Sequence, residues 1–204
     1  MFATQAAFAG IITVGEGVGF DYREISDAIV HAQSGDRIVA ANGTYAAFDL
    51  EANANASNLT LSWGASPGVI GIYGDMQVNT GGQLLFELAG TGNTQAPLFG
   101  PVDYDTVLVS GNVRYTGSVI LELISGFMPS LGDRFELIAT TGNFIWGGTL
   151  VAPTLPEGLS WQVSVESSTL QGYNGQSLVA TVIPAPGAVA LASIAGLVTI
   201  RRRR

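Results

Sequence analysis

One strand-like segment occurs twice in this chain, and the repetition limits the folds that the chain can adopt. The stretch GGQLLFELAG at 81–90 returns as TGSVILELISG at 116–126, with an offset of 35 residues. Alternate side chains of a strand point to the same face of a sheet. One face of the two copies is apolar and comprises Leu84, Phe86, Leu88, Val119, Leu121 and Leu123. Glu87 and Glu122 point the other way, so we expect both carboxylates to face solvent.

Similar strands at a fixed interval are typical of folds in which successive turns of chain stack, because no single turn can bury its own apolar face. GGTLVAP at 147–153 is a weaker third copy. We therefore predict an all-β fold, a right-handed parallel β-helix-like solenoid. An antiparallel β-sandwich stays open as the alternative, because WQVSVE at 161–166 and SLVATV at 177–182 also alternate between turns.

One amphipathic helix is predicted ahead of the C-terminal tail, within DYREISDAIVHAQSGD at 21–36. Its apolar face follows the i, i+3, i+4, i+7 pattern and comprises Ile25, Ala28, Ile29 and Ala32. Asp21 and Glu24 have the spacing of a capping box, and Gly35 is a natural stop. We expect this N-terminal helix to cap the open end of the solenoid.

The charge distribution is strongly asymmetric. The chain is 47% apolar and only 12% charged, so a disordered chain is excluded. It has no lysine and no cysteine, which excludes disulfides, thiolate metal sites and cysteine nucleophiles. Four of its eight arginines are the last four residues, 201–204. The sixteen acids and the other four arginines precede them and give a net charge of −12, which disfavours nucleic acid as a partner.

The C-terminal tail carries no charge from Ile183 to Ile200 and ends in four arginines. As a helix, this stretch would be roughly 27 Å long, close to the ~30 Å of a bilayer core. A basic cluster beside a span stays cytoplasmic, which would place the acidic body on the far side. Pro184 and Pro186 disfavour helix, so the residues ahead of the predicted transmembrane helix should be extended.

This order of features resembles the PEP-CTERM sorting signal of exported bacterial proteins. The motif is formed here by Pro184, Ala185, Pro186 and Gly187, and the basic end by Arg201, Arg202, Arg203 and Arg204. The motif lacks the glutamate that gives the family its name. The resemblance implies an exosortase-type membrane protease as partner, removal of the tail, and a location in the cell envelope or extracellular matrix. It also implies transient or permanent anchoring in the inner membrane by the C-terminal helix; a plain membrane anchor stays open as the alternative.

Two further resemblances concern the body. The segment YREISDAIVHAQSGDRIVAANGTY at 22–45 resembles the entry segment of pectin-lyase-like right-handed β-helix proteins, in which a helix leads into a first strand. Residues 80–183 are similar to the β-rich passenger regions of PEP-CTERM proteins. Neither resemblance brings a catalytic motif. At the N-terminus, Ala7-Phe8-Ala9 before Gly10 fits a signal-peptidase site, and an ordinary lead-in to a first strand is the alternative.

Few residues suggest chemistry. His31 is the only histidine and lies off the apolar face of the predicted helix, so we expect it to be exposed. Asp103 and Asp105 could form a carboxylate pair for polysaccharide cleavage or bind calcium, but a polar turn opening a strand is the preferred interpretation. We predict no catalytic residue, no cofactor and no metal site.

Other motifs have structural explanations. The glycine pairs at 81–82 and 147–148 match no phosphate-binding loop. Three glycosylation sequons begin at Asn42, Asn55 and Asn58, and are interpreted as turns. Trp63, Trp146 and Trp161 could form a sugar-stacking platform if exposed, but packing in the core is preferred.

Two functional hypotheses remain. The first is an exported, non-enzymatic cell-envelope or extracellular-matrix protein, with a possible signal-peptide remnant at 1–9, a β-rich passenger at 10–182 and a sorting signal at 183–204. Extracellular polysaccharide is a further candidate partner. The second is a carbohydrate-active β-helix enzyme, a lyase or hydrolase, or its inactive descendant. The first is preferred, because the four arginines of the body are far apart in the sequence.

Overall fold

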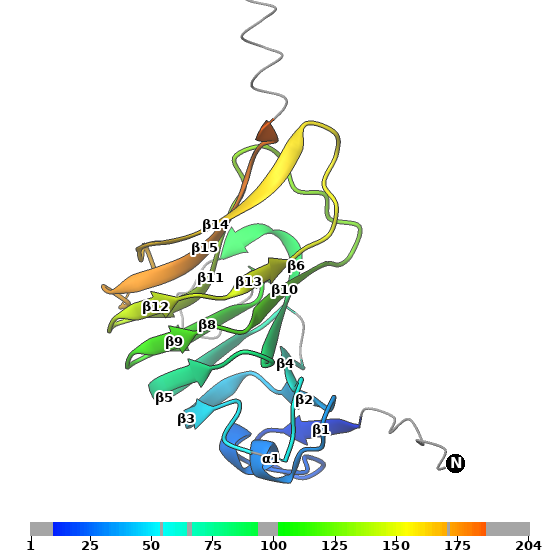
Figure 1. The fold of residues 1–204 in the computed structure, drawn as a ribbon, viewed down its shortest axis with the longest axis vertical. Coiled ribbons are helices and arrows are strands. Elements are labelled where there is room, and N and C mark those ends of the chain that lie inside the picture. The colour runs from blue at the N-terminus through cyan, green and yellow to red at the C-terminus, as the bar shows by residue number, and fades with distance from the viewer. Residues whose placement is uncertain (1–9, 54, 65–66, 94–101, 171, 187–204) are drawn as a thin grey trace, which may run out of the picture.

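The computed structural model describes residues 10–53, 55–64, 67–93, 102–170 and 172–186, which form two β-sheets and one short helix. The first sheet has the order β1-β2-β4-β6-β10-β13, with β7 paired to β6 (Figure 1). Its strands are β1 (Ile11–Val14), β2 (Arg37–Ala40), β4 (Thr60–Trp63), β6 (Gln83–Asn93), β7 (Val102–Tyr104), β10 (Ser118–Leu123) and β13 (Thr149–Val151).

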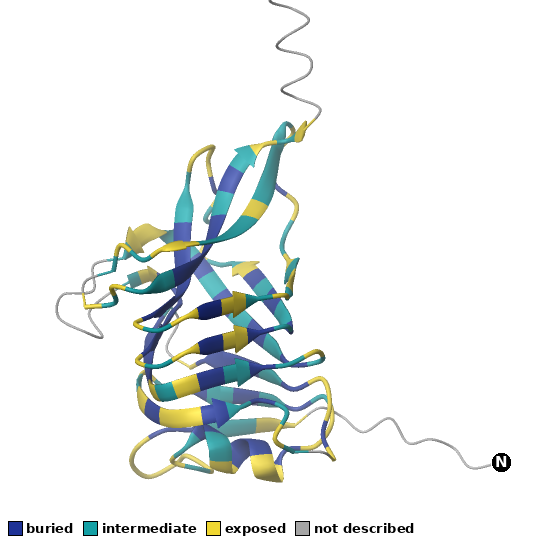
Figure 2. Ribbon diagram, turned by 60° about the vertical axis from the view of Figure 1, so that its left-hand side comes forward, coloured by how far each residue is buried: buried dark blue, intermediate teal, exposed yellow. Residues whose placement is uncertain are grey.

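The second sheet has the order β12-β9-β5-β8-β11-β15-β14, with β3 paired to β5. Its strands are β3 (Gly43–Asp49), β5 (Val69–Val78), β8 (Thr106–Val109), β9 (Val113–Tyr115), β11 (Arg134–Thr140), β12 (Phe144–Trp146), β14 (Leu159–Ser167) and β15 (Gln176–Pro184). Figure 2 shows that the buried segments of successive strands lie one above another, so the core runs along the stack.

The repeated segments pair with each other in the register that the sequence predicted. Strands β6 and β10 are parallel, and each residue from Ser118 to Leu123 pairs with the residue 35 positions earlier. The weaker third copy forms β13, which pairs with β10 in parallel. A Cβ atom on Gly117 would collide with the carbonyl oxygen of Gly82, so stacking at this turn requires glycine. Glu122 is exposed as expected, whereas Glu87 is only half-exposed.

The predicted parallel β-helix-like solenoid is nevertheless wrong, because both sheets are mixed. Strand β7 runs antiparallel to β6, and β15 runs antiparallel to both β11 and β14. The antiparallel pair β14–β15 contains the two segments that had suggested a sandwich, but an antiparallel sandwich is also wrong, because the strands from β1 to β6 in the first sheet pair in parallel. The repeat covers one strand per turn and carries no information about how β15 returns against β11.

The N-terminal helix is α1 (Ile25–His31), and it lies at one end of the stack beside β1, β2 and β3 (Figure 1). All four residues of the predicted apolar face are buried. The predicted capping box is wrong. Glu24 is the N-cap residue without a side-chain capping bond, and the Asp21 carboxylate instead accepts hydrogen bonds from the backbone N–H and the hydroxyl of Thr13, both at 2.8 Å.

The predicted transmembrane helix is contradicted. Within the described ranges, no helix has the length and apolar character needed to cross a membrane. Ile183 and Pro184, where the predicted span began, continue strand β15, and residues 187–204 lie outside the described part of the chain. The same finding contradicts two further expectations, membrane contact through a C-terminal helix and anchoring in the inner membrane. Residues 1–9, the proposed remnant of a signal peptide, also lie outside the described residues.

Candidate functional site

The proline motif follows directly on the last strand of the folded body. Pro184 is the final residue of β15 and pairs with Leu159 of β14. Pro184 and Pro186 are exposed, and Ala185 donates its backbone N–H to the carbonyl of Gly158 at 2.8 Å. In Figure 1, strands β14 and β15 carry this point away from the other strands of the stack. Gly187 and Arg201–Arg204 lie outside the described residues.

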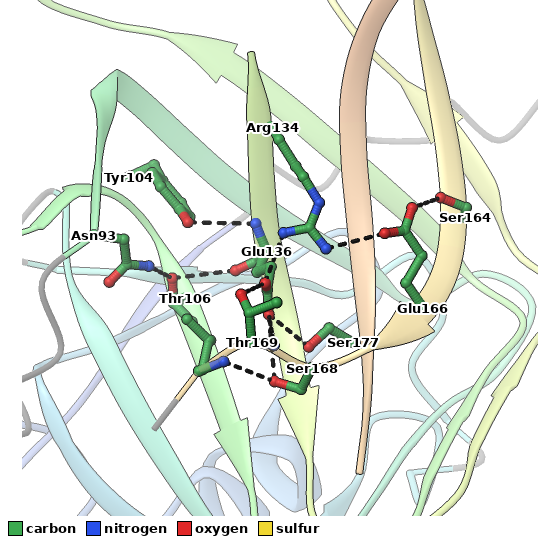
Figure 3. A network of polar contacts seen from close by, with 11 residues as sticks. Asn93, Tyr104, Thr106, Arg134, Glu136, Ser164, Glu166, Ser168, Thr169 and Ser177 are labelled. Atoms are coloured by element: carbon green, nitrogen blue, oxygen red, sulfur yellow. Dashed lines mark hydrogen bonds and ion pairs between the residues drawn. The ribbon is translucent and has the colours of Figure 1, made fainter. Parts of the chain in front are cut away.

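A second cluster of polar residues surrounds Glu136 on β11 (Figure 3). Glu136 is only 2% exposed. One carboxylate oxygen lies 2.7 Å from the Arg134 guanidinium and also accepts the Thr169 hydroxyl; the other accepts the Ser177 hydroxyl at 2.9 Å. The second oxygen also accepts longer bonds of 3.3 Å from the Ser168 hydroxyl and the Thr169 backbone N–H. The arrangement ties β11 to β15 and to the loop that precedes β15.

The backbone of Glu136 is bound to the neighbouring strands as well. Its N–H donates to the Tyr104 hydroxyl, and its carbonyl accepts the Thr106 hydroxyl, both at 3.4 Å. Arg134 continues outward to the exposed Glu166 at 3.0 Å. Burial alone would raise the pKa of the Glu136 carboxyl, but hydrogen bonds from Thr169, Arg134 and Ser177 lower it below its usual value.

The Glu136 cluster therefore holds an ionised carboxylate whose oxygens are already occupied by five donors. A general base or nucleophile must present a free lone pair to its substrate. Glu136 presents none, so the cluster joins strands and has no geometry for catalysis. The cluster was not predicted from the sequence, although a glutamate within the apolar stretch FELIA at 135–139 was a usable signal.

Asp103 and Asp105 do not form a pair. Asp103 is exposed, and its carboxylate accepts the backbone N–H of Gly92 at 3.0 Å. Asp105 is fully buried, and its two oxygens accept the backbone N–H groups of Gly68 at 2.6 Å and Glu87 at 2.7 Å. The interpretation as a polar turn is closer to the structure than a catalytic pair, because one carboxylate is exposed and the other buried. Asp105 follows β7 and precedes β8.

Burial raises the pKa of Asp105 to about 7, although the two backbone hydrogen bonds oppose the shift; the nearby Glu87 carboxylate adds to it. A carboxyl that titrates near neutrality is a feature of many general acids. Asp105, however, is enclosed by backbone and has no exposed surface. It links Gly68, ahead of β5, to Glu87 on β6 and is therefore a connector between the two sheets.

The remaining candidates lie apart from one another. His31 is exposed as predicted and stacks on Tyr22 at 5.0 Å between ring centroids. The three tryptophans form no common platform: Trp63 is buried against Phe86, Trp146 lies on Tyr115, and Trp161 lies near Phe135. The sequon residues Asn42, Asn55 and Asn58 are exposed outside the strands. The three tryptophans are therefore better described as packing residues of the fold than as a sugar-stacking platform.

No family model matches this chain, and no curated protein matches it either.

Proposed function

We propose that this chain is an exported, non-enzymatic protein of a bacterial cell envelope or extracellular matrix. We further propose that an exosortase-type protease recognises the motif at 184–187 and removes the tail. The observation that carries the proposal is the exposure of Pro184 and Pro186 at the point where the chain leaves β15.

The position matters because proteases cut chain that is accessible at the surface. Cleavage after Pro186 would cut none of the described strands, since β15 ends at Pro184 and the backbone hydrogen bond of Ala185 lies before the cut. The folded body would keep the pairing of β14 with β15. The product would lose the four terminal arginines and keep a net charge of −12.

The carboxylates of the body support a non-enzymatic role. Glu136 and Asp105, the two most deeply buried carboxylates near strand junctions, are engaged by hydrogen bonds. Asp103, the exposed member of the expected pair, lies apart from the buried Asp105 carboxylate and its two backbone partners. These contacts favour the non-enzymatic role over a carbohydrate-active enzyme.

The test is the intact mass of the protein recovered from a bacterium that carries an exosortase-type protease and from the same strain without it. We expect the tail to be missing only when the protease is present, and the product to lie outside the cytoplasm. The double variant Pro184→Ala/Pro186→Ala should keep its tail. Pro156→Ala, at another exposed proline, is the matched control and should be processed normally. A full-length mass in the presence of the protease, or a cytoplasmic product, would contradict the proposal.

A further inference from the structure

A cavity of about 740 Å³ lies beside α1. Figure 1 shows α1 at the opposite end of the molecule from the end of β15. Its walls come from three segments: the loop after β1, the entry to α1, and the turn between β2 and β3. The volume falls within the roughly 300–1,000 Å³ of typical small-molecule sites. The residues that carry the argument are Glu16, Phe20, Arg23, Glu24, Asn42 and Tyr45.

The loop that forms the first wall is fixed at its base. Val14 and Tyr22 form a β-bridge, and the Gly15 N–H donates to the Tyr22 carbonyl at 3.0 Å. The Asp21 carboxylate closes the loop by accepting two hydrogen bonds from Thr13, which lower its pKa. A loop with a closed base presents its side chains in a defined position, which reduces the entropy lost on binding.

Phe20 is held against this loop as an aromatic wall of the cavity. A Cβ atom on Gly15 would lie 2.7 Å from the Phe20 ring, so the ring sits directly on the glycine. Phe20 is nevertheless 38% exposed. An aromatic ring that is packed on one side and open on the other offers a flat apolar surface to a ligand.

The floor of the cavity is inert. The Tyr45 side chain is buried, and its hydroxyl donates to the Ala41 carbonyl at 2.6 Å. Burial, together with the carboxylates of Glu24 and Glu16, raises the pKa of Tyr45 to about 12, so the phenol stays neutral. Tyr45 therefore supplies shape and neither a charge nor a free proton.

The rim, in contrast, carries polar side chains that are available to a ligand. Glu16, Arg23 and Asn42 are exposed, and none of them makes a side-chain hydrogen bond to another described residue. Glu24 uses one carboxylate oxygen to accept the Ala46 N–H at 2.9 Å, which leaves the other oxygen free. The rim thus offers acceptors on two carboxylates and donors on a guanidinium and an amide.

These features select a class of ligand. Two carboxylates against one guanidinium, on a body of net charge −12, disfavour an anion. An aromatic wall beside mixed donors and acceptors can bind a ligand that has many hydroxyl groups and an apolar ring face. We propose that this cavity binds an uncharged sugar unit of a polysaccharide, with Phe20 against the sugar face and Glu16, Arg23 and Asn42 on its hydroxyls. The proposal stands apart from the processing of the tail.

The experiment uses the full chain and a panel of tetrasaccharides, with binding measured by saturation-transfer NMR and titration calorimetry. The neutral probes are tetramers of glucose, mannose and galactose; tetragalacturonic acid is the anionic probe and a glucosamine tetramer the cationic one. We expect at least one neutral tetramer to bind, and Phe20→Ala to weaken that binding about tenfold or more. Val18→Ala is the matched control, because Val18 lies in the same loop, is fully exposed and should leave the affinity unchanged.

Asn42→Ala provides a second variant on the opposite wall, which leaves the loop at 15–21 untouched, and should weaken binding several-fold. Thermal unfolding of each variant separates lost binding from lost folding. Three results would overturn the proposal: no neutral tetramer binds, a charged tetramer binds more tightly than every neutral one, or both variants bind as the unsubstituted protein does. None of these results depends on whether the tail is cleaved.

Discussion

Two regions of the molecule bury a carboxylate, one around Asp105 and one around Glu136, and they shift its pKa in opposite directions. Asp105, between the two sheets, is met by two backbone N–H groups and faces the carboxylate of Glu87. Glu136, on β11, is met by a guanidinium, three hydroxyls and a backbone N–H. Its pKa is lowered, whereas that of Asp105 is raised. Burial raises the pKa at both sites; the hydrogen bonds at Glu136, one of them from a guanidinium, together outweigh it, whereas the two backbone bonds at Asp105 do not.

The same comparison separates structural from binding residues. At Glu136 both carboxylate oxygens have their partners within the protein, and the cluster joins β11, β15 and β14. At the cavity beside α1, the side chains of Glu16, Arg23 and Asn42 lack such partners among the described residues, and Glu24 has one, the Ala46 N–H. Saturated polar groups hold a fold together, and unsaturated ones are available to a ligand.

The largest effect should come from removing the charge of Glu136. Glu136→Gln leaves Arg134 without its buried partner and turns one acceptor oxygen into a donor facing other donors. We expect a loss of about 3 kcal/mol in the free energy of unfolding, measured by urea denaturation at pH 7. Glu157→Gln, at an exposed turn, is the control and should change little. A loss below about 1 kcal/mol would show that the Glu136 cluster contributes little net stability.

The stability that Asp105 contributes should fall as the pH rises, because its pKa is raised, whereas the pKa of Glu136 is lowered. The folded protein binds its proton with a pKa of about 7, against about 3.9 in an unfolded chain. Stability from this group is therefore complete below pH 4 and is lost as the pH rises from about 4 to about 7, by about 2–4 kcal/mol. Asp105→Asn cannot titrate, so its unfolding free energy should lack this decrease. Urea denaturation of both proteins at pH 4, 5.5 and 7 measures the difference, and equal slopes would rule out the raised pKa.

The smallest effect should come from Glu166, the outer partner of Arg134. Its side chain is 43% exposed, so solvent screens its ion pair. Glu166→Gln should lower the free energy of unfolding by less than about 1 kcal/mol, and the loss should shrink further in 0.5 M salt. A loss as large as that of Glu136→Gln would mean that the two carboxylates act as one unit, which a double variant would show as non-additivity.

Local patterns in the sequence were enough to predict local structure. The spacing of Ile25, Ala28 and Ile29 predicted α1, because helix periodicity depends only on near neighbours along the chain. The repeat predicted the register of β6 against β10, because a one-residue slip would turn Leu84 and Phe86 out of the core.

The errors arose where distant segments meet. Asp21 binds Thr13 on β1 and caps no helix, and the pairing of β15 with β11 joins Thr181 to Arg134, far earlier in the chain. Asp105 and Glu136 owe their burial to such contacts. Their partners belong to other strands and loops, so neither carboxylate has a local sequence signature beyond its apolar neighbours. The proline motif was visible in the sequence, but its exposure at the end of β15 required the structure.

The position of β15 has a consequence for how the protein is made. It is the last of the described strands, yet it lies between β11 and β14, and both edges of it are paired. A nascent chain that ends before Gln176 thus leaves β11 and β14 with open edges, and open edges template aggregation. The second sheet therefore cannot close on these edges until the segment at 176–184 has been synthesised, although all its other described strands precede that segment.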